Sequence, residues 1–399
     1  MDWLIVRYGD LTLKGKNRGK FEKALYRRLR RSLERYPLVS VRNEFGRAYI
    51  QLNAQPMEEI IEELRRIPGL SSCSPALQCE PELEQMKGAA LSAFRTGYKP
   101  GQTFKVSVRR VDKTFPQDTN ELLPILAGHI LKNSEQVKVD VRNPDFDLKV
   151  EIRSSQVFVY GEQIDLLGGF PYGSNGKAVL MLSGGIDSPA AGFLAIRQGL
   201  EVEAIHFHSY PYTSERAKQK VVDLARKLTD YTESITLHMI PFTKIQERIR
   251  SSCQEKLWIT LMRRSMLRIS EKAAIELGGL GIVTGESIGQ VASQTLPSMN
   301  TIGRGTALPV LRPLITSDKL EIMEMAKRIG TYPISILPYE DCCTLFMPQN
   351  PSTNPNLHIV DKIEQSITDL PELLDEAWKE REVLHLHRQE KEEDFAEFL

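Results

Sequence analysis

The segment Ser183–Pro189 (SGGIDSP) constrains the fold of this 399-residue chain more than any other. It follows an apolar run, Val179–Leu182, that is typical of a buried strand, and it precedes a stretch with helical periodicity. Two adjacent glycines allow a sharp turn and a close approach of the backbone to a ligand. The N-terminus of the following helix presents unpaired N–H groups and a positive dipole end, which favour a phosphate group. We therefore predict a strand–loop–helix phosphate site formed by Ser183, Gly184, Gly185 and Ser188.

This loop differs from a Walker phosphate loop. Gly176 and Lys177 resemble the end of that motif, but Pro171 occupies the position of its first glycine. Ala178 stands where a Ser or Thr would bind magnesium. The alternative is a tight turn in which Asp187 merely caps the helix. The complete seven-residue pattern between a strand and a helix favours the phosphate site.

The pattern after residue 177 predicts a doubly wound parallel sheet, because apolar strand candidates alternate with helical stretches. The four candidates are Ala178–Leu182, Val202–His206, Ser234–Ile240 and Gly281–Val283. Ligands of such sheets bind at the carboxyl ends of the strands. His206–His208 and Gly285–Gln290 follow two of these strands, so we expect both segments beside the phosphate loop. Arg263 and Arg264 lie in a predicted helix, Lys256–Leu277, where a solvated face and a site role are both open.

The net charge of zero is a cancellation between two ends of the chain. Residues 1–50 contain 13 Lys and Arg against 5 Asp and Glu, whereas residues 361–399 contain 5 against 13. A basic helix is predicted over Lys16–Arg35, with Phe21, Leu25, Leu29 and Leu33 as its buried stripe. The basic end predicts an anionic partner such as nucleic acid. Residues 370–399 are predicted to form an acidic amphipathic helix.

The first 165 residues predict two small α+β modules. Strand and helix signals alternate as in a split βαβ unit up to about residue 75. A second module contains a helix that ends near Thr96, a strand over Thr103–Arg110 and a helix over Thr119–Lys132. Asn143–Asp145 is predicted to be a hairpin turn between two further strands. Residues 166–176 are rich in Gly and Pro and predict a linker.

The five cysteines are sparse and odd in number, which favours a reducing cytoplasm over a disulfide-bonded secreted protein. No run approaches the ~18 apolar residues of a membrane span, and the N-terminus has no signal-peptide pattern, so we expect no membrane association. Cys73, Cys79 and Cys253 are interpreted as buried fillers. Cys342 and Cys343 lie in a polar loop, where a thiolate suits a nucleophile or a persulfide carrier.

With Ser183–Pro189 and this cysteine pair, the chain resembles the tRNA 4-thiouridine synthetase (tRNA uridine 4-sulfurtransferase) family over nearly its whole length. The run Arg109–Phe115 resembles the THUMP pattern, and Met181–Ser188 resembles the nucleotide loop of PP-loop ATP pyrophosphatases. The resemblance implies an N-terminal ferredoxin-like domain (1–75), a THUMP RNA-binding domain (76–165), a linker (166–176) and a doubly wound PP-loop domain (177–399). The family's rhodanese domain is expected to be missing. The ATP contacts implied by the resemblance are Met181, Leu182, His206, Phe207, Arg263, Gly285 and Gln294, in addition to the loop residues.

The resemblance also implies the chemistry. The uridine O4 attacks the α-phosphate of ATP, with Mg²⁺ neutralising the developing charge, and a persulfide sulfur then replaces the adenylated oxygen. Asp187 is expected to position the metal or the substrate, and Cys342 to carry the sulfur, with Cys343 as the alternative carrier. No protein metal site is predicted. The implied partners are tRNA, modified at position 8, a cysteine desulfurase, a sulfur-carrier protein of thiazole (thiamine) synthesis and a second copy of the chain.

Two other functions fit parts of the same pattern. Another PP-loop tRNA modifier, such as a 2-thiouridine or lysidine synthetase, would use the same loop but lacks the N-terminal RNA-binding module. A non-catalytic tRNA-binding protein would not need an intact Ser183–Ser188 loop together with Cys342. The N-terminal RNA-binding module and the intact loop together with Cys342 therefore favour the sulfurtransferase.

Overall fold

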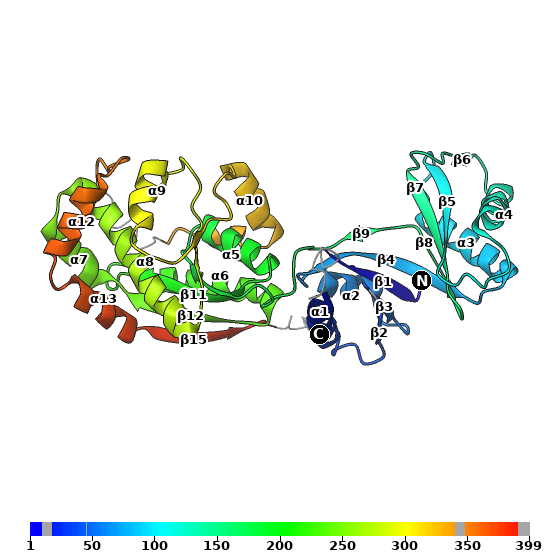
Figure 1. Cartoon of the computed structure of the whole chain (residues 1–399), viewed down its shortest axis with the longest axis horizontal. Helices are drawn as coiled ribbons and strands as arrows, with labels where there is room; N and C mark the ends of the chain where they lie inside the picture. Colours follow the sequence, from blue (N-terminus) through cyan, green and yellow to red (C-terminus); the bar gives the residue numbers. More distant parts are fainter. Residues whose placement is uncertain (10–17, 45, 340–347, 390–399) are drawn as a thin grey trace, which may run out of the picture. The chain divides into compact units, whose positions relative to one another are not determined.

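The computed structural model describes residues 1–9, 18–44, 46–339 and 348–389. The chain divides into two compact units, Met1–Pro171 and Tyr172–Leu399 (Figure 1). Within the described ranges, no helix combines the length and the apolar character that a membrane crossing requires.

The first unit is built around one mixed sheet of nine strands. Its strands are β1 (Trp3–Tyr8), β2 (Ser40–Glu44), β3 (Arg47–Gln51), β4 (Leu70–Cys79), β5 (Thr103–Arg110), β6 (Lys138–Val139), β7 (Phe146–Ile152), β8 (Val157–Tyr160) and β9 (Ile164–Asp165). The helices are α1 (Arg18–Ser32), α2 (Met57–Leu64), α3 (Leu83–Gly97) and α4 (Thr119–Lys132). The strand order is β2-β3-β1-β4-β8-β7-β5-β6, and β9 pairs with β4.

Helix α1 buries the stripe that its four-residue repeat predicts. Leu25, Leu29 and Leu33 are buried, and Phe21 packs partly buried against the same core. The cationic side chains Lys20, Lys23, Arg27 and Arg30 lie on the exposed remainder of the helix. The sequence therefore specified both the core face and the basic face of α1.

Strand β4 joins the two halves of this sheet. Its first residues pair with β1, with Leu70 opposite Tyr8, and its last residues pair with β8, with Cys79 opposite Val157. Figure 1 shows β4 continuing from beside β1 to beside β8. Residue 75, where we place the end of the first domain, lies inside this strand, and the domain boundary stays a prediction.

The predicted hairpin turn at Asn143–Asp145 is wrong. Strands β6 and β7 both pair in parallel with β5, one on each side of it, so they are not neighbours. The Asp145 carboxylate instead accepts hydrogen bonds from the Thr103 N–H and hydroxyl, each at 2.8 Å. Turn composition indicated a reversal of the chain, but it carried no information about which strand would lie between the two ends.

The second unit contains the predicted parallel sheet. Its strands are β10 (Lys177–Met181), β11 (Glu201–His208), β12 (Ser234–Pro241), β13 (Ile282–Val283), β14 (Val310–Leu311) and β15 (Glu382–His387). The helices are α5 (Asp187–Arg197), α6 (Glu215–Thr232), α7 (Thr243–Ser252), α8 (Trp258–Leu277), α9 (Leu296–Gly303), α10 (Lys319–Arg328), α11 (Tyr332–Ser335), α12 (Leu357–Ser366) and α13 (Leu370–Lys379), with 3₁₀ turns at Glu255–Leu257 and Ala292–Gln294. The order β14-β13-β10-β11-β12-β15 is parallel except for β15. The chain winds outward in both directions from β10, so the switch point of the sheet lies between β10 and β13.

The C-terminal segment is not one helix. Helix α13 ends at Lys379, and β15 then pairs antiparallel with β12, with Leu386 opposite Ile235 and Leu384 opposite Leu237 (Figure 1). The acidic composition suited a solvated helix, but pairing with the edge of an existing sheet satisfies the backbone of residues 382–387 as well. Residues 390–399 lie outside the described ranges.

Candidate active site

The phosphate loop connects β10 to α5 at the switch point of the sheet. The Ser188 hydroxyl accepts a hydrogen bond from the Ser183 N–H at 2.8 Å and lies 3.1 Å from the Ser183 hydroxyl. The Gly185 N–H donates to the Ser183 hydroxyl at 3.3 Å. The two serines therefore close the loop on itself. The N-cap residue of α5, Ile186, makes no side-chain cap hydrogen bond, so the N–H groups at the start of this helix favour an anion.

A pocket opens beside this loop at the carboxyl edge of the sheet. It is lined by Met181, Leu182, Ser183, Gly185, Asp187, Ser188, His206, Phe207, Arg263, Met266, Thr284, Gly285, Glu286 and Gln294. Apart from Gly184, which belongs to the loop, and Cys342, the structure brings all the sequence-predicted site residues together. Cys342 and Cys343 lie outside the described residues. Sequence reasoning did not assign Met266 or Thr284 to the site, and it placed Glu286 beside the loop only as part of the segment Gly285–Gln290.

The strand ends form the wall of this pocket on the β11 side. The His206 ring is buried, and its Nδ1 lies 2.9 Å from the Leu182 carbonyl oxygen, to which it donates. Phe207 and Met266 add apolar surface. Burial and the neighbouring His206 lower the pKa of His208 to about 4, so that ring is neutral at physiological pH. This side of the pocket suits a flat, uncharged base better than a phosphate.

Gly285 allows the loop after β13 to approach the phosphate loop closely. A Cβ at this position would lie 2.6 Å from the Ser188 nitrogen and 2.7 Å from the Asp187 carbonyl carbon. Both atoms belong to backbone at the start of α5 and have little room to move. Glycine is therefore required here by contact with the phosphate loop.

Glu286 holds a buried ionic cluster at the rim of the pocket. It accepts hydrogen bonds from Arg263, from Arg312 at 2.6 Å and from the Thr284 hydroxyl at 3.1 Å. Burial alone would raise the pKa of Glu286, but the two guanidinium groups outweigh it and hold the pKa below 4.5. The carboxylate thereby fixes the position of Arg263 in the pocket wall.

Asp187 pairs with a cation that no sequence pattern connects with the loop. Its Oδ1 lies 2.7 Å from Nζ of Lys319, at the start of α10. The sequence around Lys319 shows only a capping box, Asp318 with Glu321. Only the folding of α10 against α5 brings Lys319 to the phosphate site. The Gln294 Oε1 is also buried at the pocket and has no partner among the described residues, so it is an acceptor for a ligand.

Arg264 does not lie on a solvated helix face and does not line this pocket. It is 2 % exposed, and it donates to Glu364 at 2.7 Å, to Asp361 at 2.7 Å and to the Thr301 carbonyl at 2.8 Å. Adjacent helical residues point about 100° apart, so Arg263 reaches the site while Arg264 ties α8 to α12 and α9. The periodicity of α8 alone did not reveal this division.

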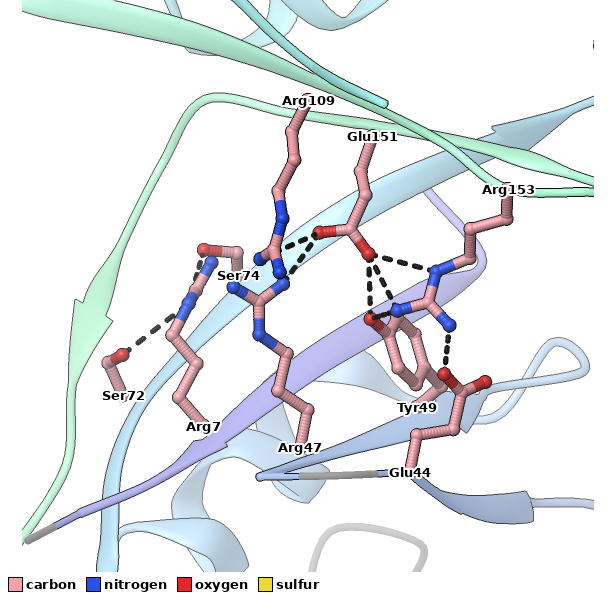
Figure 2. A network of polar contacts seen from close by, with 9 residues as sticks. All are labelled: Arg7, Glu44, Arg47, Tyr49, Ser72, Ser74, Arg109, Glu151 and Arg153. Atoms are coloured by element: carbon pink, nitrogen blue, oxygen red, sulfur yellow. Dashed lines mark hydrogen bonds and ion pairs between the residues drawn. The ribbon is translucent and has the colours of Figure 1, made fainter. Parts of the chain in front are cut away.

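The first unit contains a second concave site, with an excess of positive charge. It is lined by Arg7, Arg47, Ser107, Val108, Arg109, Lys149, Val150, Glu151 and Tyr160. Figure 2 shows Glu151 at the centre of the adjoining network, where Arg47 and Arg153 each approach it to 2.7 Å and the Tyr49 hydroxyl donates at 3.0 Å. The buried Glu151 has a pKa below its ordinary value, because these arginines outweigh its burial. The lining thus contains four cationic side chains and one carboxylate, which pairs with Arg47 and Arg109.

Arg7 leaves part of its guanidinium unused in this site. Its Nη1 donates to Ser74 at 3.1 Å (Figure 2), and its plane lies over the Tyr160 ring, 5.3 Å from the ring centroid. Its Nη2 is buried without a partner among the described residues. A buried N–H donor in a basic concavity favours an anionic group such as a phosphate.

Three family models match consecutive parts of the chain. They are the ThiI ferredoxin-like domain over residues 3–74, the THUMP domain over residues 80–162 and the thiamine biosynthesis protein ThiI over residues 173–368. Among solved structures, a 4-thiouridine synthetase in complex with RNA and ATP is 41 % identical, with a TM-score of 0.86, over 97 % of this chain and 100 % of that one. PH1313 from Pyrococcus horikoshii Ot3 is 26 % identical, with a TM-score of 0.62, over 83 % of this chain and 100 % of that one.

Proposed function

The chain belongs to the ThiI family of 4-thiouridine synthetases, and from this membership we propose that it is an ATP-dependent tRNA sulfurtransferase that converts a uridine to 4-thiouridine. The carrying observation is the pocket at the switch point, where an uncapped helix N-terminus, Asp187, Lys319 and Arg263 surround the phosphate loop. The structural relative of 41 % identity was solved with both RNA and ATP. Its match over 97 % of this chain supports the same pair of ligands here.

In the first step, the uridine O4 attacks the α-phosphate of ATP, the α–β phosphate bond breaks and pyrophosphate leaves. The loop N–H groups and the cations Lys319 and Arg263 stabilise the negative charge of the phosphates. The neutral, apolar wall of Phe207 and Met266 binds the adenine. The sequence-predicted residues of the pocket then form the ATP site, with Gln294 as a hydrogen-bond acceptor for the nucleotide.

One carboxylate of the pocket is placed to hold a magnesium ion. Mg²⁺ is commonly held by one or two carboxylates together with substrate phosphates. Glu286 is buried and bound by two arginines, whereas Asp187 is partly exposed and paired with one lysine, Lys319, whose exposed side chain can move aside. Asp187 is therefore the carboxylate that would hold the ion. When bound, the ion supplies positive charge to the phosphate oxygens.

In the second step, the terminal sulfur of a cysteine persulfide attacks C4 of the adenylated uridine and AMP leaves, which joins the cysteine to C4 through a disulfide. A second thiol then attacks the sulfur of that cysteine, so the S–S bond breaks and 4-thiouridine is released. The cysteine disulfide that remains is returned to thiols by an external thiol reductant. We place the persulfide on Cys342, with Cys343 as the alternative. The described cysteines support this choice by their chemistry: burial raises the pKa of Cys73, Cys79 and Cys253 to about 11, so their thiols are protonated and poorly nucleophilic at neutral pH.

A thiolation assay tests the proposal. The protein is incubated with tRNA, ATP, cysteine and a cysteine desulfurase, and the near-ultraviolet absorbance of 4-thiouridine is followed. We expect Cys342→Ser and Asp187→Asn to abolish product and Cys253→Ser, at a protonated thiol, to retain it. Full activity of Cys342→Ser, with loss in Cys343→Ser, would move the sulfur to Cys343, and activity in both would refute a cysteine carrier at this loop.

We propose the remaining partners, with family membership as the support. The ThiI family model is described as a thiamine biosynthesis protein, which supports sulfur donation to a carrier protein of thiazole synthesis as a second role. A cysteine desulfurase is the proposed sulfur source, the cytoplasm the proposed compartment and a homodimer the proposed assembly. Light scattering of the purified chain tests the homodimer, and transfer of radioactive sulfur from cysteine to the purified carrier protein tests the second role.

A further inference from the structure

Two tyrosines stand exposed on the turn between β11 and α6, next to the candidate active site. Tyr210 is 65 % exposed and Tyr212 is 52 % exposed. Phe207, which lines the pocket, precedes Tyr210 by three residues, a span of at most about 11 Å along the chain. Both tyrosines therefore lie at the carboxyl edge of the sheet, where a substrate must enter to reach the phosphate loop.

The turn that carries these tyrosines is held at several points. The Ser209 N–H donates to the Thr213 hydroxyl at 3.2 Å, and the Thr213 N–H donates back to the Ser209 carbonyl at 3.0 Å. The Thr243 hydroxyl, at the start of α7, donates to the Tyr210 carbonyl at 2.8 Å. A turn fixed in this way presents its aromatic rings to solvent at little further entropic cost on binding.

The surroundings of the two rings carry charges of both signs: the Tyr212 hydroxyl donates to Glu247 at 3.3 Å, and Glu215 and Arg216 both lie exposed in the first turn of α6. Helix α6 begins directly after the turn, with Ser214 as its N-cap, so its positive dipole end lies at this edge. Arg216 is exposed in the first turn of α6 and has no ion pair within the described part of the chain. Exposed aromatic rings beside an unpaired guanidinium are the arrangement with which proteins bind unstacked bases and their backbone.

We propose that Tyr210 and Tyr212 form a stacking platform for unpaired bases of the RNA substrate at the mouth of the active site. The inference rests on the proposed function, because attack by the uridine O4 requires the base to leave its stack and enter the pocket. When the uridine leaves its stack, the faces of the two flanking bases become exposed. The tyrosine rings bind these faces, while Arg216 and the N-terminus of α6 contact the adjoining phosphate.

An RNA-binding measurement tests the platform without any sulfur chemistry. A minimal tRNA substrate carries 2-aminopurine next to the target uridine, and its fluorescence is titrated with the protein. We expect wild type to quench the probe by stacking. The double variant Tyr210→Ala/Tyr212→Ala loses the quench and binds RNA roughly 5- to 150-fold more weakly. The double Tyr→Phe variant keeps both the quench and the affinity within about twofold, because phenylalanine stacks equally.

Two controls separate the platform from other roles. Ile275, on α8, is 67 % exposed, so Ile275→Ala removes an exposed apolar side chain of the same unit and should leave RNA binding unchanged. ATP affinity without RNA should also be unchanged in the double alanine variant. An equal loss of ATP affinity would overturn the platform, because the tyrosines would then belong to the nucleotide pocket. Unchanged RNA affinity would overturn it too, and weaker binding of a cysteine desulfurase in that case would assign the face to the sulfur donor.

The platform and the proposed function fail in different ways. If wild type makes no 4-thiouridine but the alanine variant still loses RNA affinity and quench, the proposed function is wrong and the platform stands. If wild type is active and the variant binds RNA normally, the proposed function stands and the platform is wrong.

Discussion

The contact between Gly285 and the phosphate loop makes a sharp prediction for Gly285→Ala. The added methyl would lie 2.6 Å from the Ser188 nitrogen, 0.8 Å short of the 3.4 Å at which ordinary van der Waals contact begins. Its neighbours are backbone atoms of Asp187 and Ser188, so no side chain can rotate away. The variant must instead displace the start of α5 or the end of β13 by most of that distance.

The displacement determines the size of the effect. Overpacking of a tight interior contact costs about 1–3 kcal/mol of stability. A misplacement near 1 Å at a catalytic site costs about 100-fold in rate. We therefore expect Gly285→Ala to fold, to bind ATP more weakly and to lower kcat for thiolation by about 10- to 100-fold. RNA binding by the basic surfaces of the first unit should be retained, because the substitution lies in the second unit.

The matched control is Gly279→Ala, at the other end of β13. Its new Cβ would meet Ala274 at 3.4 Å, which is ordinary contact. Calorimetry of ATP binding, single-turnover thiolation and chemical unfolding are measured for both variants. Wild-type ATP affinity and rate in Gly285→Ala would refute the argument that this glycine sets the spacing of the loop.

Three further predictions concern the charged groups. The two guanidinium groups hold the pKa of Glu286 below its ordinary value, so its stabilising contribution is present above the ordinary pKa of a glutamate and is lost as the pH falls through the folded-state pKa. Glu286→Gln should therefore unfold at a lower temperature than wild type at pH 7, and its unfolding temperature should fall less steeply on acidification. An unchanged slope would contradict this. Arg264→Ala leaves a buried carboxylate short of a partner and should lower the free energy of unfolding by about 3 kcal/mol, measured in urea, whereas Arg268→Ala, at a 41 % exposed side chain, should cost about 1 kcal/mol or less. Binding of tRNA should weaken steeply with salt, because the basic surfaces of the first unit neutralise phosphates, and a salt-independent dissociation constant in filter binding would exclude phosphate-dominated contact.

The local elements of the chain could be predicted from sequence because they depend on nearby residues. Strand β5 and helix α4 begin and end where periodicity places them, at Thr103–Arg110 and Thr119–Lys132. The parallel sheet of the second unit also follows from the alternation of strands and helices. Strand β15 could not be predicted in this way, because its pairing with β12 joins residues some 150 positions apart.

The same distinction holds for the site. The phosphate loop is a continuous segment whose glycines, serines and following helix identify it without any distant contact. Lys319 beside Asp187 and the buried pairing of Arg264 with Glu364 join residues 132 and 100 positions apart. No local pattern encodes such pairs.

The sequence by itself determined the strand, glycine loop and helix of the proposed phosphate site and the parallel sheet that carries them, because the residues that form each element are neighbours in the chain. Tertiary structure alone decided which charges surround that loop. Arg263 and Arg264 are adjacent and chemically identical, yet one lines the pocket and the other is buried against α12. The side of α8 that each residue occupies, and the helices packed on that side, set the difference.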